Sequence, residues 1–331
     1  MQDHDVVGIG NAIVDIIGQC DDAFLSRHGR TKGSMELVDA ALVAKLYAAM
    51  GPGIEMSGGS AANTMVGVAS FGGRAGFIAK TADDQFGQVF RHDIRAAGVT
   101  FTTPPAAAGG EPTGRSLILV TPDGQRTMNT MLGVSPQLGA EEVDGDLIRS
   151  GRILYLEGYL FDRPQAKAAF RQAAEIAAKA GRQVALTLSD PFCVDRHRAE
   201  FQAFVRSSVD ILFANEAEIA SLYEANNFEE AAGRARSEAK LAAITRSEKG
   251  SVILSADGML TIPAAPVAKV VDTTGAGDLY AAGFLFGVAT GRDLETAGRL
   301  GSLAAAEIIS HVGARPQVKL DELARKTGLL S

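Results

Sequence analysis

The stretch VVDTTGAGDLYAAGFLFGVATG, Val270–Gly291, combines acids, threonines and glycines in a short turn and then continues as an apolar helix. Gly275 and Gly277 allow the backbone to approach a ligand closely and to point its N–H groups outward. Those N–H groups, with the positive end of the helix dipole behind them, predict an anion site. Asp278 lies at the helix start beside this site, so its carboxylate is a candidate general base.

A plain structural interpretation of the same turn is that Asp278 caps the helix while the glycines make a tight bend. Asp272, Thr273 and Thr274 crowd the turn as well, and a cap does not need them.

Other phosphate-binding signatures are weaker. The segment GIGNAI, residues 8–13, has isoleucine where a dinucleotide fingerprint has its third glycine, and no G-x-x-x-x-G-K-[ST] pattern of a P-loop occurs.

Composition narrows the classes of function. The chain has 331 residues, 46% hydrophobic and 21% charged, with a formal net charge of -7. An acidic chain without a basic run is not expected to bind nucleic acid. Cys20 and Cys193 are far apart, which predicts neither a disulfide nor a zinc site. Without a signal-peptide pattern or a long apolar run, we expect a soluble cytoplasmic protein with no membrane partner.

Short β-branched segments alternate with helical patterns, as in a parallel α/β fold. The strand segments are mostly apolar without alternation, which is expected when helices cover both faces of a sheet. Strands are predicted within residues 5–17, 74–82, 151–160, 183–192, 209–218 and 241–254, and helices within 60–72, 164–181 and 295–310.

Residues 101–132 depart from this alternation. A Pro/Gly-rich segment leads to RSLILV, residues 115–120, and a Pro-Asp-Gly turn separates it from QRTMNT, residues 125–130. This order predicts a β-hairpin. The hairpin could form a lid over the site, or it could be an edge hairpin of the main sheet.

Four motifs together resemble the ribokinase-like (PfkB) family of sugar and nucleoside kinases. They are GNAIVD at residues 10–15, GGSAANT at 58–64, FANEAE at 213–218 and DTTGAGD at 272–278. The segments EPTGRS, LSDPF and RLGSLAAAEIISHVGAR are similar to the adenosine kinase branch. The resemblance implies one ribokinase-like domain over residues 1–331. Its expected fold is a three-layer α/β/α arrangement with a mostly parallel doubly wound sheet and a small β lid from about 12–40 and 99–131.

The resemblance assigns a catalytic role to several residues. Asp278 would remove the proton of the acceptor hydroxyl, and the amides of Gly275, Ala276 and Gly277 would stabilise the transferred phosphoryl group. Arg126, which follows the hairpin turn, would reach over the phosphates when the lid closes.

The family also implies binding residues for the acceptor and for the nucleotide. Asp15 would accept hydrogen bonds from a vicinal ribose diol, which suits a carboxylate. The remaining acceptor-site candidates are Asn11, Gly58, Gly59 and Asn63. On the nucleotide side, the candidates are Asn215, Glu218, Thr245 and Gly250.

Glu218 would hold water around Mg²⁺, and Asp272 and Thr274 are candidates for a monovalent cation such as K⁺. The expected activity is ATP- and Mg²⁺-dependent phosphorylation of the primary hydroxyl of adenosine. A simple sugar such as ribose or fructose is the alternative acceptor, and Glu36 in the lid segment keeps it open. A non-catalytic ligand sensor is a further alternative. The partners would be small molecules alone, and the chain would act as a monomer or homodimer.

Overall fold

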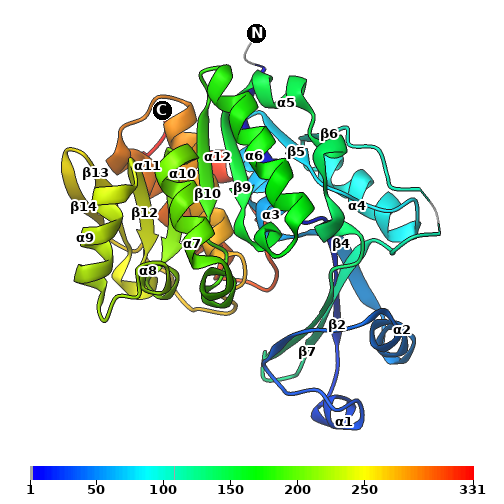
Figure 1. The fold of residues 1–331 in the computed structure, drawn as a ribbon. Helices are drawn as coiled ribbons and strands as arrows, with labels where there is room; N and C mark the ends of the chain where they lie inside the picture. The colour runs from blue at the N-terminus through cyan, green and yellow to red at the C-terminus, as the bar shows by residue number, and fades with distance from the viewer. Residues whose placement is uncertain (1–2, 108) are drawn as a thin grey trace.

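The computed structural model describes residues 3–107 and 109–331. A nine-stranded sheet forms the body of the molecule, with the order β14-β13-β12-β11-β10-β9-β1-β5-β6 (Figure 1). The strands from β6 to β12 are parallel, whereas β13 and β14 continue the sheet antiparallel at one edge. Its strands are β1 His4–Ile9, β5 Ala75–Ile78, β6 Val99–Phe101, β9 Gly151–Glu157, β10 Gln183–Thr187, β11 Ile211–Asn215, β12 Leu241–Thr245, β13 Ser251–Ser255 and β14 Gly258–Ile262.

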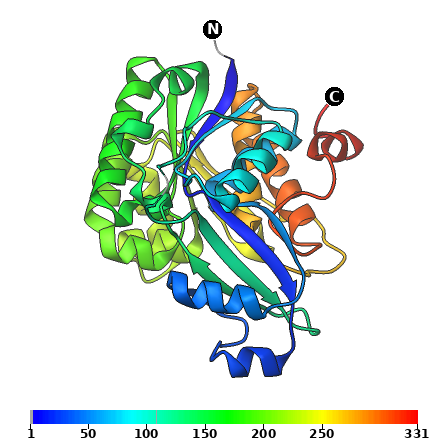
Figure 2. The ribbon, with the colours of Figure 1, turned by 90° about the vertical axis from the view of Figure 1, so that its right-hand side faces the viewer.

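Helices cover both faces of this sheet, as Figure 2 shows from the side, which gives the expected three-layer architecture. One face carries α3 Ser60–Ser70, α4 Gln85–Ala96, α10 Ala276–Ala289, α11 Leu294–Ile308 and α12 Leu320–Lys326. The other carries α5 Gly145–Ser150, α6 Pro164–Lys179, α7 Pro191–Ser208, α8 Glu216–Tyr223 and α9 Phe228–Glu238. In the described part of the chain, no helix is long and apolar enough to cross a membrane.

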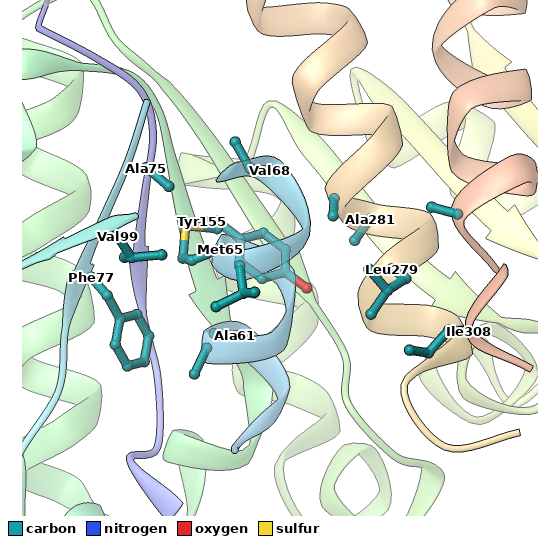
Figure 3. Close-up of a cluster of buried hydrophobic side chains, with 14 of the residues drawn as sticks. Ala61, Met65, Val68, Ala75, Phe77, Val99, Tyr155, Leu279, Ala281 and Ile308 are labelled. Atoms are coloured by element: carbon teal, nitrogen blue, oxygen red, sulfur yellow. The ribbon is translucent and has the colours of Figure 1, made fainter. Parts of the chain in front are cut away.

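Helices α3 and α10 pack against each other in the larger hydrophobic core (Figure 3). Met65 of α3 and Leu279 of α10 are both fully buried there. A side chain at Gly67 would meet Ala282, so the two helices approach closely at this point. This close packing sets the relative position of the two helix N-termini, which is where the candidate site lies.

A second sheet of five strands projects from the body, in the order β3-β8-β7-β2-β4. Its pairs are alternately parallel and antiparallel. Its strands are β2 Ile13–Gln19, β3 Met35–Leu37, β4 Gly53–Gly58, β7 Gly114–Val120 and β8 Arg126–Met131, with α1 Asp22–Arg27 and α2 Ala40–Ala49 beside them. We call these five strands and two helices the lid.

The predicted hairpin is present as β7 and β8, and it lies in the lid sheet, so the alternative of an edge hairpin in the main sheet is wrong. Two details differ from the expected lid segments. Strand β4 also belongs to the lid sheet, and β6 belongs to the main sheet. Both differences arise from long-range pairing: β4 pairs with β2, and β6 with β5.

The segment predicted as one strand over residues 5–17 is two strands in two sheets. Strand β1 ends at Ile9 and β2 begins at Ile13. A side chain at Gly10 would collide with Glu157 and Ala61, so the chain can pass this point only with glycine. The link carries the chain from the body into the lid.

Candidate active site

The candidate site lies where the lid meets the carboxyl edge of the main sheet, beside the N-termini of α3 and α10. Open α/β sheets bind ligands at this edge. Asp278, in the first turn of α10, accepts a hydrogen bond from the Ser60 hydroxyl at 2.6 Å and another from Asn63 Nδ2 at 2.9 Å. Burial raises the pKa of Asp278, and these two donors together with the charge of Arg315 oppose the shift. The carboxylate is therefore oriented by α3 and made more basic by its surroundings.

The turn before α10 has the form that the sequence predicted. Gly275 is the N-cap of the helix in a left-handed conformation (φ 77°) and makes no side-chain cap bond, so Asp278 is not a helix cap. Within residues 3–107 and 109–331, no carbonyl accepts the N–H groups of Gly277 and Asp278. The Ala276 N–H differs from the expectation because it donates to the Thr273 carbonyl at 3.2 Å. The free N–H groups at this helix start can still meet an anion.

Asp15 lies on β2 of the lid and faces the same region. Burial raises the pKa of Asp15 to about 6, while Arg315 and Arg126 oppose the shift. A side chain at Gly58 would overlap the Asp15 carboxylate. Gly59, the N-cap of α3, has φ 101° and leaves no room for a side chain beside the Asn11 carbonyl. These glycines allow close contact between protein segments, and their expected role toward an acceptor stays a prediction.

Ser60 and Asn63, at the start of α3, also belong to the candidate site. Gly59 is the N-cap of α3, and the Ser60 hydroxyl donates to Asp278. Asn63 Oδ1 is buried and has no hydrogen-bond partner in the described part of the chain. A buried acceptor without a partner is costly, so this oxygen is suited to a ligand hydroxyl.

The Asn11 amide makes hydrogen bonds within the protein at both of its polar atoms. Its Nδ2 donates to Glu157 Oε1 at 2.6 Å, and its Oδ1 accepts from the Ser135 hydroxyl at 3.0 Å. Glu157 also accepts the Ala61 N–H at 2.8 Å, so the end of β9 is connected to the first turn of α3. Burial raises the pKa of Glu157 to about 7, although N–H groups donate to it. Asn11 thus supports the start of α3, and its expected contact with an acceptor stays a prediction.

Glu157 was missed by sequence reasoning, and so was Arg315. Arg315 donates to the Ser57 carbonyl at 2.9 Å and to the Ala62 carbonyl at 2.9 Å, which connects β4 to α3. Burial lowers the pKa of Arg315 to about 10. In the sequence, each residue is marked only by its charge in a mostly apolar segment. Glu157 lies in LYLEGYL and Arg315 in HVGAR.

Arg126, at the start of β8, reaches from the lid to the turn before α10. Its Nη2 donates to Asp272 Oδ1 and to Thr274 Oγ1. Its Nη1 is buried without a partner in the described residues. The residues expected to hold a monovalent cation are thus in contact with the lid arginine.

A cavity of about 840 Å³ opens beside the free N–H groups of α10. Asn215, Thr245 and Gly250, expected on the nucleotide side, line this cavity, as does Gly277. Asn215 and Glu218 form a reciprocal capping box at the start of α8, in which Asn215 Nδ2 donates to Glu218 Oε1 at 2.7 Å. Burial raises the pKa of Glu218 to about 7, and the charges of Asp190 and Asp278 add to the shift.

A second cavity of about 910 Å³ lies at the lid and is lined by Leu37, Thr130 and Met131, among others. The strand register connects it to Asp15: Asp15 is opposite Ser116, Ser116 opposite Thr130, and Thr130 opposite Leu37. Residues opposite one another share a sheet face, so this row runs from the diol-binding candidate to the cavity. Phe161 and Phe170 lie away from this row, in the core on the other side of the main sheet.

Comparisons with known proteins identify relatives over most of the chain. Residues 55–320 match the model of the pfkB family carbohydrate kinases. The crystal structure of a probable sugar kinase protein from Rhizobium etli CFN 42 is 49% identical, with 100% of each chain covered and a TM-score of 0.92. That of adenosine kinase from Sinorhizobium meliloti is 52% identical, covering 98% of this chain and 99% of that one, with a TM-score of 0.90. An ATP-dependent ribose-1-phosphate kinase from Halopiger xanaduensis is 31% identical, covering 82% of this chain and 86% of that protein.

Proposed function

Because this chain belongs to the pfkB family of carbohydrate kinases, we propose that it transfers the γ-phosphoryl group of ATP to the primary hydroxyl of a ribose-containing acceptor, with adenosine as the first candidate. The observation that carries the proposal is the position of Asp278. Its carboxylate lies in the first turn of α10, between free helix N–H groups and the acceptor-facing residues of α3 and the lid.

Asp278 acts as the general base in this proposal. It accepts the proton of the attacking hydroxyl, and its raised pKa makes it a stronger base than an exposed aspartate. Ser60 and Asn63 hold the carboxylate in one orientation by donating to its two oxygens. A base positioned in this way contributes about 10²- to 10⁴-fold to the rate.

The N–H groups of Gly277 and Asp278 stabilise negative charge that develops during transfer. They begin a buried helix, so their dipoles are already oriented. Loss of one such donor typically costs about 10²- to 10³-fold in kcat. Arg126 Nη1 is buried and without a partner in the described residues, so it keeps a donor available for a ligand.

The chain fits ATP and Mg²⁺ on the nucleotide side. The cavity beside Gly277 is lined by Thr245 and Gly250 at the β12–β13 turn, and it reaches the free N–H groups of α10. Asn215 and Glu218, at the start of α8, would hold water around Mg²⁺. When bound, ATP supplies the phosphoryl group and Mg²⁺ reduces the charge on its oxygens.

The lid favours a nucleoside over a simple sugar. The row from Asp15 to Leu37 crosses three strand spacings, about 14 Å in all. A ribose diol at Asp15 would leave the rest of this row, and the cavity at Leu37 and Met131, for a larger apolar group such as a purine. The similarity to the Sinorhizobium meliloti adenosine kinase supports the same choice.

A sugar or sugar phosphate is the second candidate. Ser116 and Thr130, the residues nearest Asp15 in the row, carry hydroxyl groups that suit a polar acceptor. The Halopiger xanaduensis relative is named for ribose 1-phosphate. A non-catalytic sensor remains the alternative outside the enzymes.

The test is an ATP-consumption assay over a panel of adenosine, other nucleosides, ribose, fructose and ribose 1-phosphate. We expect adenosine to give the highest kcat/KM, with AMP as the product. A higher kcat/KM with a sugar would assign the second candidate. If Asp278→Asn consumed ATP as fast as the wild type with every acceptor, the proposed mechanism would be wrong.

A further inference from the structure

The Arg126 guanidinium contacts the two residues expected to hold a monovalent cation, Asp272 and Thr274. The family resemblance made Asp272 and Thr274 candidates for a monovalent cation, but Asp272 Oδ1 and Thr274 Oγ1 accept hydrogen bonds from the Arg126 guanidinium. A guanidinium and a metal ion cannot occupy the same position. The residues present therefore do not fit a monovalent cation at this place.

The surroundings of Asp272 require a positive charge. The Asp272 side chain is 2% exposed, and that of Arg126 is 10% exposed. Asp272 Oδ1 also accepts the Thr274 N–H at 2.9 Å, and Oδ2 accepts the Gly313 N–H at 2.8 Å. A carboxylate this buried is costly without a partner of opposite charge. Across residues 3–107 and 109–331, Arg126 is the only ion-pair partner of Asp272.

Arg126 and Asp272 come from different parts of the molecule. Arg126 begins β8 of the lid, whereas Asp272 opens the turn that leads to the free N–H groups of α10. The charge that compensates Asp272 therefore arrives with the lid. The pKa of Arg126 is lowered overall, because burial is the largest effect. Asp272 opposes this shift, and Asp15, which also lies near the guanidinium, opposes it to a smaller extent.

We propose that the Arg126 guanidinium takes the place of a monovalent cation at Asp272 and Thr274, so that this kinase positions its anion-binding turn without K⁺. The positioning residue is Arg126, which acts on the turn through Asp272. The inference rests on the proposed kinase activity only for its rate measurement, because cation binding to the fold can be measured separately.

The first experiment measures the wild type in KCl and in choline chloride at equal ionic strength. The kinase rate and the melting temperature are followed together. We expect the rate to differ by less than about 2-fold and the melting temperature by less than about 1 °C between the two salts. A several-fold higher rate, or a clearly higher melting temperature, in KCl would overturn the proposal.

The second experiment uses Arg126→Met, which keeps an unbranched stem and removes the guanidinium with its charge. Asp272 then lacks a counter-charge, so K⁺ but not choline should raise the melting temperature by more than about 2 °C. K⁺ should also recover part of the lost kinase rate. If the melting temperature of Arg126→Met were the same in both salts, K⁺ would not bind at the position of the guanidinium, and the proposal would be wrong.

Lys32→Met is the matched control. Lys32 pairs with Asp22 and Asp123 elsewhere on the lid, at 2.8 Å and 2.7 Å. Its loss removes a lid charge without touching Asp272, so it should create no K⁺ response. If the wild type phosphorylates no acceptor in the panel, the proposed function fails while the melting temperatures still decide the cation question.

Discussion

The Ser60 hydroxyl donates to Asp278 Oδ1 at 2.6 Å and joins the first turns of α3 and α10, although the residues are 218 positions apart in the sequence. Each helix contributes a different part of the candidate site. Helix α10 carries the carboxylate and free N–H groups, and α3 carries the donors that orient the carboxylate. The packing of α3 on α10 is therefore a condition for catalysis as well as for stability.

Asp278→Asn should lower kcat by about 10²-fold or more, because an amide cannot accept the hydroxyl proton. Acceptor and nucleotide affinities should stay within a few-fold of the wild type, since Asp15 and the nucleotide cavity are unchanged. Steady-state kinetics and calorimetric binding would measure the two effects. A turnover within a few-fold of the wild type would remove Asp278 from the role of base.

Ser60→Ala should move the acidic limb of the rate profile to higher pH. The Ser60 hydroxyl stabilises the charged form of Asp278 and opposes the increase in pKa that burial causes. Without this donor, the pKa of Asp278 rises further and the base is protonated over a wider pH range. The measurement is kcat/KM against pH for both proteins, and an unchanged or downward-shifted limb would contradict the assignment.

A feature of the site could be predicted from the sequence when the residues that form it lie close together along the chain. The turn at Asp272–Asp278 could be predicted because the glycines, the acid and the helix start lie within one short segment. The division of residues 5–17 into two strands could not, because it depends on Glu157, which occupies the space beside Gly10. Asn11 and Glu157 are 146 positions apart.

The same reason explains the residues that were missed. Arg315 acts on Ser57, 258 positions away, and the charge of Arg315 in HVGAR does not indicate this partner. At Gly58 and Gly59 the groups that approach closely in the structure are Asp15 and Asn11, whereas the approach of an acceptor stays a prediction. Short-range motifs therefore predict where a site lies, while the supporting contacts require the fold.

Glu157→Gln should make stability less dependent on pH. The pKa of Glu157 rises from 4.5 to about 7 on folding because of burial. The folded state thus keeps a proton that the unfolded state releases, so the contribution of Glu157 to stability is complete below 4.5 and is lost as the pH rises through about 7. The wild type should lose up to about 3 kcal/mol relative to the variant over this range.

Urea unfolding at about pH 5 and about pH 8 would measure this difference. Glu175→Gln, which removes an exposed carboxylate on α6, is the control and should change the pH dependence little. If Glu157→Gln shows the same pH dependence as the wild type, the Glu157 carboxyl does not change its proton affinity on folding.

Gly59→Ala should destabilise the fold by about 2–4 kcal/mol. The backbone at Gly59 has φ 101°, and a methyl group there would collide with the Asn11 carbonyl. Gly72→Ala is the matched control: its φ is 84°, but nothing lies within 4 Å of the added atom. The control should cost only about 1 kcal/mol. Equal losses for both variants in urea unfolding would show that the contact with Asn11 contributes nothing.

Arg315→Met should be among the most damaging substitutions outside the catalytic turn. It leaves the Ser57 and Ala62 carbonyls without their donor and removes the charge that faces Asp15 and Asp278. A buried carbonyl left without a donor costs about 1–3 kcal/mol, and two are affected here.

Arg315→Lys should recover only part of this stability. Its ammonium restores the charge, but it cannot reach both carbonyls as a guanidinium fork does.

In Arg315→Met the pKa values of Asp15 and Asp278 should rise further, since Arg315 lowers both in the wild type. The acidic limb of kcat/KM should therefore move to higher pH, an effect that a purely structural role would not produce. Arg299→Met removes an exposed ion pair on α11 and should leave both stability and the limb nearly unchanged. If the limb of Arg315→Met stays at the wild-type position while stability falls, Arg315 supports α3 without tuning the carboxylates.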